Sequence, residues 1–381
     1  MTDVYIVGID MLKFGKFPGR TPGELGAEAA LGAMDEAGIT IKDVQALYSG
    51  NQFDLAGMVG QAIQKQIGQT GIPVANIKNA CATGATAFRE AMMLIKAGEA
   101  SVTLAVGSEV MPRGLLGGGA PAEGIPTEGL FGSDSMPCVF AEAGQDYARQ
   151  HGVTFEQFAK VSVKNHHHAT MNPKAIYQTE TPLEMVMGAE MIAYPNTKLM
   201  CSVNVDGAAA AVLMSGEEVR RRGLMDRAVK VRASALASDP YTPQNAAMWD
   251  VNAPTRLAAD WAYAQAGIGP EDLDLVELHD CFATAELLHY ENLRLCGVGE
   301  AGLMIDDGET ALGGRIPVNV SGGLLSKGHP IAATGIANLY ELALHLRGRA
   351  GARQVDEARL GLAHVVGLGT VAAVHILEKV N

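Results

Sequence analysis

The sequence predicts an α/β protein built from two similar halves, with an insertion in the first half. Three observations support this fold class. Short apolar runs alternate with longer alanine-rich segments, three short patterns recur in the same order in both halves, and the first copy is much longer between its second and third patterns. At the start of the chain, residues 4–9 are expected to form a strand, residues 23–37 a helix and residues 102–106 another strand.

The later elements continue the same alternation. Residues 155–168 are expected to form a helix opened by Thr154, and residues 231–235 a strand. Residues 273–276 read as a strand that precedes a helix over residues 283–295.

Three internal echoes indicate a duplication. They pair residues 37–43 with 266–272, residues 82–84 with 333–335, and residues 207–213 with 369–374. The first pair, Ala-Gly-Ile followed by aspartate, recurs 229 residues later and follows a helix-like segment each time. In the second pair, Ala-Thr-Gly opens an alanine-rich helix in both halves.

The excess length of the first half lies between Met111 and about Val203 and is expected to be an insertion. Such a segment either forms a lid or binding loop or is a purely structural excursion. The predicted organisation is an N-terminal half made of residues 1–110 and 204–235, an inserted loop domain over residues 111–203, and a C-terminal half over residues 236–381.

Composition excludes several classes of function. The 381 residues carry 29 Lys and Arg against 42 Asp and Glu, a formal charge of −13, so a basic nucleic-acid footprint is not expected. Hydrophobic residues make up 48% of the chain, which argues against global disorder. The longest uncharged stretch, residues 360–377, holds two histidines and three glycines, so it predicts two buried strands around a turn rather than a membrane span.

The five cysteines are sparse and form no C-x-x-C pair, which argues against a disulfide framework or a cysteine zinc site. The N-terminus enters a β-branched run at once, without the basic region of a secretory signal. These features predict a reduced, cytoplasmic location.

Cys81 is the first candidate for chemistry. It lies where an apolar run gives way to a helix of small residues. A thiol at a helix N-terminus faces the positive end of the helix dipole, which favours the nucleophilic thiolate. The alternative is a small buried core residue.

A glycine-rich turn, residues 321–330, delivers His329 just before the helix that begins near Ile331. By the repeat, this helix start is the counterpart of the one that follows Cys81. If the two halves pack about a pseudo-dyad, His329 is expected to approach Cys81 and to accept its proton. A loop histidine without such a role is the alternative.

The third candidate group is His279-Asp280-Cys281, which follows the expected strand over residues 273–276. Continued strand alternation places His279 and Cys281 on one side and Asp280 on the other. An imidazole that stabilises an oxyanion beside a thiol that moves a proton fits this pattern, although an ordinary turn and helix cap fits it as well.

Other motifs predict less. The consecutive histidines 166–168 point in three directions on a helix, so no metal site is expected there. Residues 297–302 match G-x-G-x-x-G, but they follow a helix-like segment where a dinucleotide site requires a strand. Residues 367–372 follow a strand but lead into another one, so they are not a nucleotide site either.

Taken together, four ordered motifs resemble the thiolase superfamily, specifically the sterol-carrier-type thiolases, over essentially the whole chain. They are residues 79–84 (Asn-Ala-Cys-Ala-Thr-Gly), 279–282 (His-Asp-Cys-Phe), 328–330 (Gly-His-Pro) and 367–369 (Gly-Leu-Gly). The resemblance implies a duplicated five-layer α-β-α-β-α fold with an inserted loop domain, and a homodimer. It also implies acyl-CoA and CoA as substrates, with no metal or redox cofactor.

The resemblance also assigns roles to residues. Cys81 would be acylated, His329 would activate it and help bind the thioester oxygen, and His279 would stand where many thiolases have asparagine. The backbone N–H groups of Cys81 and Gly369 would form the oxyanion hole. Ser202 resembles a serine that contacts CoA in related thiolases.

Two departures from the wider family stand out. Most thiolases carry a second cysteine in a C-terminal Cys-x-Gly motif, whereas this chain has Gly367 at that place. Sterol-carrier-type thiolases share this change and have a cysteine at the place of Cys281, which predicts that the acid–base function has moved there. Ala332 replaces a glycine that is common in the family, a change that concerns local packing.

The function predicted from these features is a thiolase that cleaves or forms a 3-oxoacyl-CoA by acyl transfer through Cys81 to CoA. The alternatives are a condensing enzyme, an aldolase acting on CoA esters, and a non-catalytic scaffold or lipid carrier. Some bacterial sterol-carrier-type thiolases work with a small OB-fold partner, so such a partner is a further possibility for this chain.

Overall fold

The nine strands of the main sheet follow a nearly symmetric order. The structure is a computed structural model that describes residues 2–112, 136–241, 250–367 and 371–380. The strands lie in the order β3 (Val74–Ile77), β2 (Ala46–Gly50), β4 (Val102–Glu109), β7 (Gly207–Ser215), β1 (Val4–Met11), β8 (Val229–Ser238), β11 (Val371–Lys379), β10 (Leu360–Gly367) and β9 (Leu275–Glu277).

Equivalent strands of the two halves flank a central antiparallel contact between β1 and β8. Only two residue pairs join β1 to β8, Tyr5 with Lys230 and Ile6 with Val229. On one side β7 is antiparallel to β1 and β4, and β2 is parallel to β4. On the other side β11 is antiparallel to β8 and β10, and β9 is parallel to β10. The directions match strand by strand, which confirms the duplicated fold predicted from the sequence echoes.

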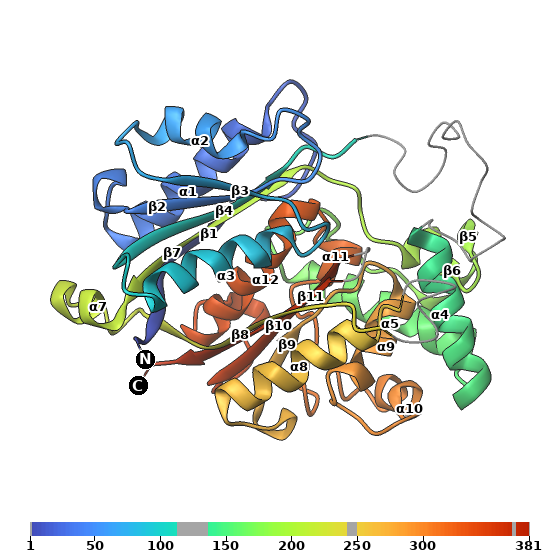
Figure 1. Cartoon of the computed structure of the whole chain (residues 1–381). Coiled ribbons are helices and arrows are strands. Elements are labelled where there is room, and N and C mark those ends of the chain that lie inside the picture. Colours follow the sequence, from blue (N-terminus) through green and yellow to red (C-terminus); the bar gives the residue numbers. More distant parts are fainter. Residues whose placement is uncertain (1, 113–135, 242–249, 368–370, 381) are drawn as a thin grey trace.

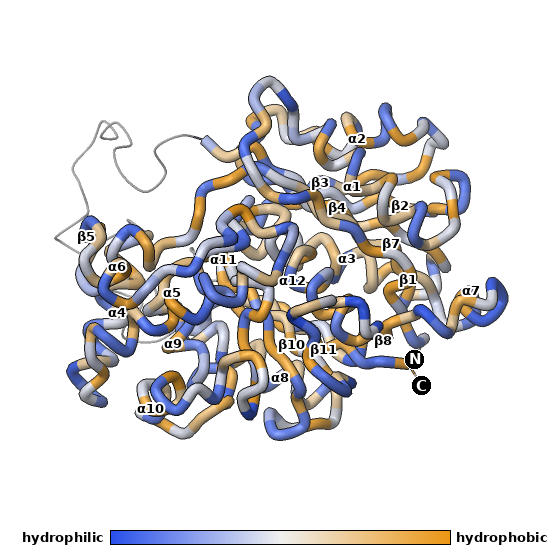
Figure 2. Tube along the Cα trace, turned by 180° about the vertical axis from the view of Figure 1, so that it is seen from behind, coloured by the Kyte–Doolittle hydropathy of each residue, from blue (hydrophilic) through white to orange (hydrophobic). Residues whose placement is uncertain are grey.

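Helices complete five layers around the two halves of the sheet (Figure 1). Helices α1 (Pro22–Ala37) and α2 (Val59–Ile67) cover one outer face, and α8 (Ala253–Ala266) covers the other. Helices α3 (Thr83–Lys96) and α12 (Ile331–Leu346) lie between the two halves of the sheet, and every residue of α12 is buried. Figure 2 shows apolar residues along the central strands and hydrophilic ones on α7 (Gly216–Arg222) and the outer loops.

Local signals explain the first sequence echo. Helix α1 begins with a capping box between Thr21 and Glu24 and ends at Gly38, whose φ of 69° is left-handed. Helix α8 ends in the same way at Gly267, with a φ of 67°. A short 3₁₀ turn follows in each half, Ile41–Asp43 and Pro270–Asp272. The repeated Ala-Gly-Ile pattern is therefore one helix ending used twice.

The expected insertion packs beside the second half of the sheet. Its elements are α4 (Met136–His151), α5 (Phe155–Thr170), α6 (Leu183–Met187), the hairpin of β5 (Met191–Ala193) and β6 (Asn196–Thr197), and the 3₁₀ turn Lys198–Met200. They contact α9 (Ala283–Asn292), α10 (Ala301–Asp306) and α11 (Gly323–Ser326). The domain boundaries at residues 110, 203 and 235 stay predictions; β8 crosses the last of them and pairs with β11 along most of its length.

Most expected elements are present, with small differences at their ends. Thr154 caps α5 through a capping box with Gln157, as predicted. The helix expected over residues 283–295 ends at Asn292, because Arg294 takes a left-handed φ of 61°. The uncharged stretch over residues 360–377 forms the buried antiparallel strands β10 and β11. None of the described helices is long and apolar enough to cross a bilayer.

Candidate active site

A tight turn between β3 and α3 presents Cys81. Ala80 takes a left-handed φ of 48°. The Thr83 hydroxyl donates to the Ala80 carbonyl at 2.6 Å and accepts the Asn79 N–H at 2.8 Å. These two hydrogen bonds stabilise the conformation of the turn. Cys81 is 3% exposed. The first turn of α3 therefore fixes the backbone that carries this thiol.

His329 is oriented by the first turn of α12. Its Nδ1 lies 2.7 Å from Thr334 Oγ1, and the Thr334 hydroxyl donates to the Pro330 carbonyl at 3.0 Å. The hydroxyl has one proton, so Nδ1 of His329 must carry the proton of the shared bond, and Nε2 is the basic nitrogen. Burial lowers the pKa of His329 to about 3, which keeps the imidazole neutral.

The two helix starts meet because small residues let their backbones approach. A Cβ added at Gly84 would lie 2.4 Å from the Ala332 carbonyl oxygen, and one added at Gly335 would lie 2.5 Å from the Ala85 nitrogen. Gly84 and Gly335 are the equivalent glycines of the second sequence echo. The close approach expected between the two helix starts is thus present, with Ala332 at the contact.

His279 joins Cys81 and His329 in one cluster. The Cys81 sulfur and one ring nitrogen from each histidine all lie within 4.8 Å of one another. The two imidazole rings are 5.2 Å apart between centroids and meet edge to face. Burial and the neighbouring histidines, His329 first among them, hold the pKa of His279 well below its usual value, so this ring is also neutral.

Cys281 lines the same pocket, and Asp280 points away from it, as strand alternation predicts. Burial, with smaller effects from Cys81 and Asp280, raises the pKa of Cys281 well above its usual value. Cys281 is therefore protonated at neutral pH and can act as a proton donor.

Asp280 holds the loop that leads to His329. Its carboxylate accepts the Leu324 N–H at 2.7 Å and the Asn165 amide at 2.8 Å. A Cβ added at Gly323 would lie 2.0 Å from an Asp280 oxygen, so glycine is required for α11 to approach this closely. Asp280 was expected only to point away from the site; the structure gives it an orienting function.

The pocket also receives residues from the insertion. Ser202 lines it, and the Ser202 N–H donates to the Cys281 carbonyl at 2.9 Å. Gly369, the other expected oxyanion donor, lies outside the described residues. The remaining wall is mostly apolar and is formed by Met111, Met136, Phe140, Val203, Asn204, Phe282, Ile331 and Val366. An apolar wall around a thiol and two neutral imidazoles suits an acyl group.

One sulfur and two imidazole nitrogens are also donors that zinc accepts, and Cys81, His279 and His329 could hold such an ion. The expectation that no metal takes part stays a prediction. The histidines 166–168 make separate contacts: His167 reaches Glu180 at 2.7 Å, and His168 reaches the Asn319 carbonyl at 3.0 Å.

Comparison with known proteins agrees with this geometry. The family model for the thiolase N-terminal domain matches residues 4–192, and the model for the thiolase C-terminal domain-like region matches residues 238–379. The chain belongs to the thiolase family. Its similarity to sterol carrier protein 2 of Oryctolagus cuniculus is 38% identity, covering 98% of this chain and 72% of that protein.

Two other similar proteins are named for CoA-ester chemistry, and a solved structure shares the fold. Acetyl-CoA acetyltransferase of Methanothermobacter thermautotrophicus is 36% identical over 100% of both chains. Benzoylsuccinyl-CoA thiolase subunit BbsB of Thauera aromatica is 36% identical over 96% of this chain and 95% of that one. The solved Ltp2-ChsH2(DUF35) aldolase has a TM-score of 0.82 at 25% identity, covering 99% of this chain and 98% of that chain. The protein is therefore a thiolase-type enzyme of CoA esters.

The sequence analysis did not identify the residues that orient the side chains of the site. Thr334 was noticed only as part of an echo, although a hydroxyl five residues after His329 at a helix start was an available signal. Asn165, which anchors Asp280, lies 115 residues away in the chain, so no local pattern could connect the two.

Proposed function

We propose that this protein is a thiolase that cleaves or forms a 3-oxoacyl-CoA by acyl transfer through Cys81 to CoA. The observation that supports this most is the cluster of one thiol and two neutral imidazoles within 4.8 Å, with the protonated Cys281 in the same pocket. Nucleophile, base, oxyanion donor and acid are all provided by side chains.

In the first step His329 Nε2 takes the proton of Cys81, and the sulfur attacks the keto carbon of the 3-oxoacyl-CoA. The bond between the second and third carbons then breaks, which leaves an acyl thioester on Cys81 and the enolate of the departing CoA ester. N–H donors from the protonated His329 and from His279 stabilise the enolate oxygen. Cys281 then gives its proton to the carbanion carbon.

In the second step CoA attacks the acyl thioester. The Cys281 thiolate takes the proton of the CoA thiol, the new thioester leaves with CoA, and His329 returns its proton to Cys81. Both residues regain their initial protonation states, so the cycle needs no other reagent. Ser202, at the wall of the pocket, is proposed to contact CoA, and the backbone N–H groups of Cys81 and Gly369 to bind the acyl oxygen.

The test is thiolysis of 3-oxoacyl-CoA esters of increasing chain length, combined with intact mass measurement after incubation with acyl-CoA. We expect acyl adducts on Cys81, and no thiolysis by Cys81→Ala. Limited alkylation with iodoacetamide at neutral pH should modify Cys81 first, because burial raises the pKa of both Cys201 and Cys296 to about 12. Alkylation of those cysteines while Cys81 stays unmodified would contradict the assignment.

A second candidate is an aldolase acting on CoA esters, favoured by the similarity to the Ltp2-ChsH2(DUF35) aldolase. Such a reaction does not need an acylated Cys81. Cleavage of a 3-hydroxyacyl-CoA to an aldehyde by both the wild-type protein and Cys81→Ala would support this candidate, because only the thiolase route passes through the thioester.

We further propose a homodimer, in a cytoplasmic setting, that acts without a metal or redox cofactor. A small OB-fold partner is a further proposal. The names of two similar proteins support a partner of some kind, because one is called a subunit and the other carries a second name, ChsH2(DUF35). Light scattering of the purified chain measures the first property. Activity of the chain alone, compared with a preparation from its native host, measures the need for a partner.

A further inference from the structure

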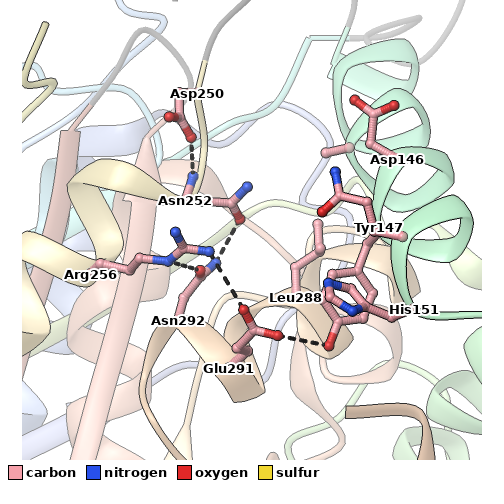
Figure 3. A pocket seen from close by; sticks show the side chains of 11 residues that line it. Asp146, Tyr147, His151, Asp250, Asn252, Arg256, Leu288, Glu291 and Asn292 are labelled. Atoms are coloured by element: carbon pink, nitrogen blue, oxygen red, sulfur yellow. Dashed lines mark hydrogen bonds and ion pairs between the residues drawn. The ribbon is translucent and has the colours of Figure 1, made fainter. Parts of the chain in front are cut away.

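A hydrogen-bonded chain runs from a second pocket toward the active site. This pocket lies between α4, α8 and α9 and is lined by Arg256, Asn252 and Asn292 (Figure 3). Arg256 Nε donates to Asn292 Oδ1 at 2.8 Å, and Asn292 Nδ2 donates to Asn252 Oδ1 at 2.7 Å. Arginine can only donate, so these two bonds fix which end of the Asn292 amide is oxygen.

The orientation of Asn292 determines the tautomer of His289. Asn292 Nδ2 also lies 3.2 Å from His289 Nδ1, and an amide nitrogen can only donate. His289 therefore accepts at Nδ1 and carries its proton on Nε2. Burial, with a smaller effect of Arg256, lowers the pKa of His289 to about 3, so the ring is neutral. Its Nε2–H is buried and has no hydrogen-bond partner among the described residues.

His279 has the complementary unpaired atom. Its Nδ1 is buried and has no hydrogen-bond partner within the described parts of the chain. Because Nδ1 is enclosed, Nε2 is the nitrogen that His279 presents to the active-site pocket. His279 and His289 both border His364: its ring packs against that of His289, and its Nδ1 lies 3.5 Å from the backbone nitrogen of His279.

His364 contacts both residues, but its two ring nitrogens are already paired with other groups. Its Nδ1 is 3.5 Å from the backbone nitrogen of His279, and its Nε2 is 3.1 Å from Thr255 Oγ1. The His364 and His289 rings meet edge to face, 4.6 Å apart between centroids. Both nitrogens of His364 are thus used, and His279 and His289 form no direct hydrogen bond with each other.

We propose that His289 is a positioning residue that holds His279, through one bound water, in the tautomer with its proton on Nε2. The water accepts the His289 Nε2–H and donates to His279 Nδ1. This satisfies one buried donor and one buried acceptor that are otherwise unpaired, a costly condition inside a protein. It leaves His279 with an N–H aimed into the pocket, where the proposed thiolase reaction develops an enolate oxygen. The proposal therefore rests on the proposed function.

The test compares His289→Leu with His289→Gln. Glutamine places an amide N–H close to the position of Nε2, whereas leucine has no donor. For His289→Leu we expect kcat of thiolysis to fall roughly 10–100-fold, a usual range for the loss of an orienting partner, with KM little changed. His289→Gln should recover most of kcat. Alkylation of Cys81 by iodoacetamide should keep its wild-type rate in both variants, since it does not use His279.

His345→Leu is the matched control. This histidine is also buried, with Nδ1 accepting the Val355 N–H at 3.1 Å and Nε2 without a partner among the described residues. It lies near the far end of α12, about 21 Å along the helix from its start. The control should keep wild-type kcat. Wild-type kcat in His289→Leu, or equal loss in His289→Leu and His289→Gln, would overturn the proposal.

A second readout does not depend on activity. With ¹⁵N-histidine labelling, the ring nitrogens of His279 should show the Nε2–H tautomer in the wild-type protein and in His289→Gln, and a mixture of tautomers in His289→Leu. If the wild-type protein lacks thiolysis, the proposed function fails, while this spectrum still reports on His289. A His279 spectrum identical in all three proteins would exclude the positioning role even in an active thiolase.

Discussion

Nδ1 of His329 lies 2.7 Å from Thr334 Oγ1, and the same hydroxyl donates to the carbonyl of Pro330. Thr83, the equivalent residue of the other half, likewise donates to a carbonyl at its own helix start, that of Ala80, and accepts a hydrogen bond from the N–H of Asn79. In one half this arrangement stabilises the turn that carries Cys81, and in the other it selects which nitrogen of the His329 imidazole is basic.

Thr334→Val should therefore slow acylation of Cys81 roughly 10–100-fold, because valine has the same shape but leaves His329 Nδ1–H without an acceptor. Thr334→Ser keeps the hydroxyl and should retain most activity. Burst-phase mass spectrometry with an acyl-CoA measures acylation directly. Similar rates for the valine and serine variants would show that the hydroxyl does not control the tautomer of His329.

Cys281→Ala should separate the two chemical steps. Acylation of Cys81 from an acyl-CoA needs only His329 and the oxyanion donors, so it should continue. Carbon–carbon cleavage and condensation should slow by roughly 10²–10⁴, the usual range for a lost general acid or base. Acyl-enzyme formation by intact mass and thiolysis of a 3-oxoacyl-CoA are measured on the same preparation. Cleavage at the wild-type rate would mean that another group carries the proton.

His279→Asn should keep more thiolysis activity than His279→Ala. An amide can still donate toward the enolate oxygen or hold a water there, whereas a methyl group can do neither. Steady-state thiolysis by both variants decides between them. Equal losses would indicate that His279 contributes something other than a donor.

Stability should fall steeply below pH 6.5, because buried histidines must become charged on unfolding. The pKa is lowered by burial to about 3 or 4 at residues 166, 168, 289, 329, 345 and 375. Between pH 6.5 and 4 the unfolded chain therefore binds more protons than the folded one, and each histidine removes about 1.4 kcal/mol per pH unit. Glu109, whose pKa burial raises to about 7, acts in the opposite sense, and so do Glu277 and Asp280.

Urea denaturation at pH 7, 6 and 5 measures this slope. His375→Gln provides the comparison, since its ring is buried on β11 and contacts Ser234 at 3.0 Å, outside the residues that line the active-site pocket. Removing this one titrating group should make the slope shallower by about 1.4 kcal/mol per pH unit. An unchanged slope would mean that His375 binds its proton equally in both states.

The sequence predicted those features that depend on local patterns. The shared helix endings at Gly38 and Gly267 and the cap at Thr154 follow from residue types within a few positions. The approach of Cys81 to His329 was predicted because the repeat implied a pseudo-dyad between the two helix starts. Because of the duplication, a contact between residues 248 positions apart could be predicted from the sequence.

Features that depend on the fold of the insertion could not be predicted. Asn165 reaches Asp280, and Lys164 reaches Glu286 at 2.5 Å, from a helix whose direction no local pattern specifies. The relation of His289 to His279 was equally hidden. The two unpaired nitrogens lie on a helix and just after a strand, so no local pattern connects them. The tautomer of His289 depends on Asn292, whose amide orientation is in turn fixed by Arg256.

The pseudo-two-fold symmetry of the fold relates two helix starts, but only one of the two related positions carries a thiol and only one carries an imidazole. The counterpart of Cys81 in the other half is Ala332, whose methyl group cannot act as a nucleophile. The counterpart of His329 is Lys78, which turns outward and donates to the carbonyl of Asp54 at 2.7 Å. The proposed reaction centre therefore lies on one side of the pseudo-axis, with no equivalent thiol or imidazole at these two positions on the other side. In the proposed mechanism the second half therefore provides the groups that orient and protonate what the first half binds covalently.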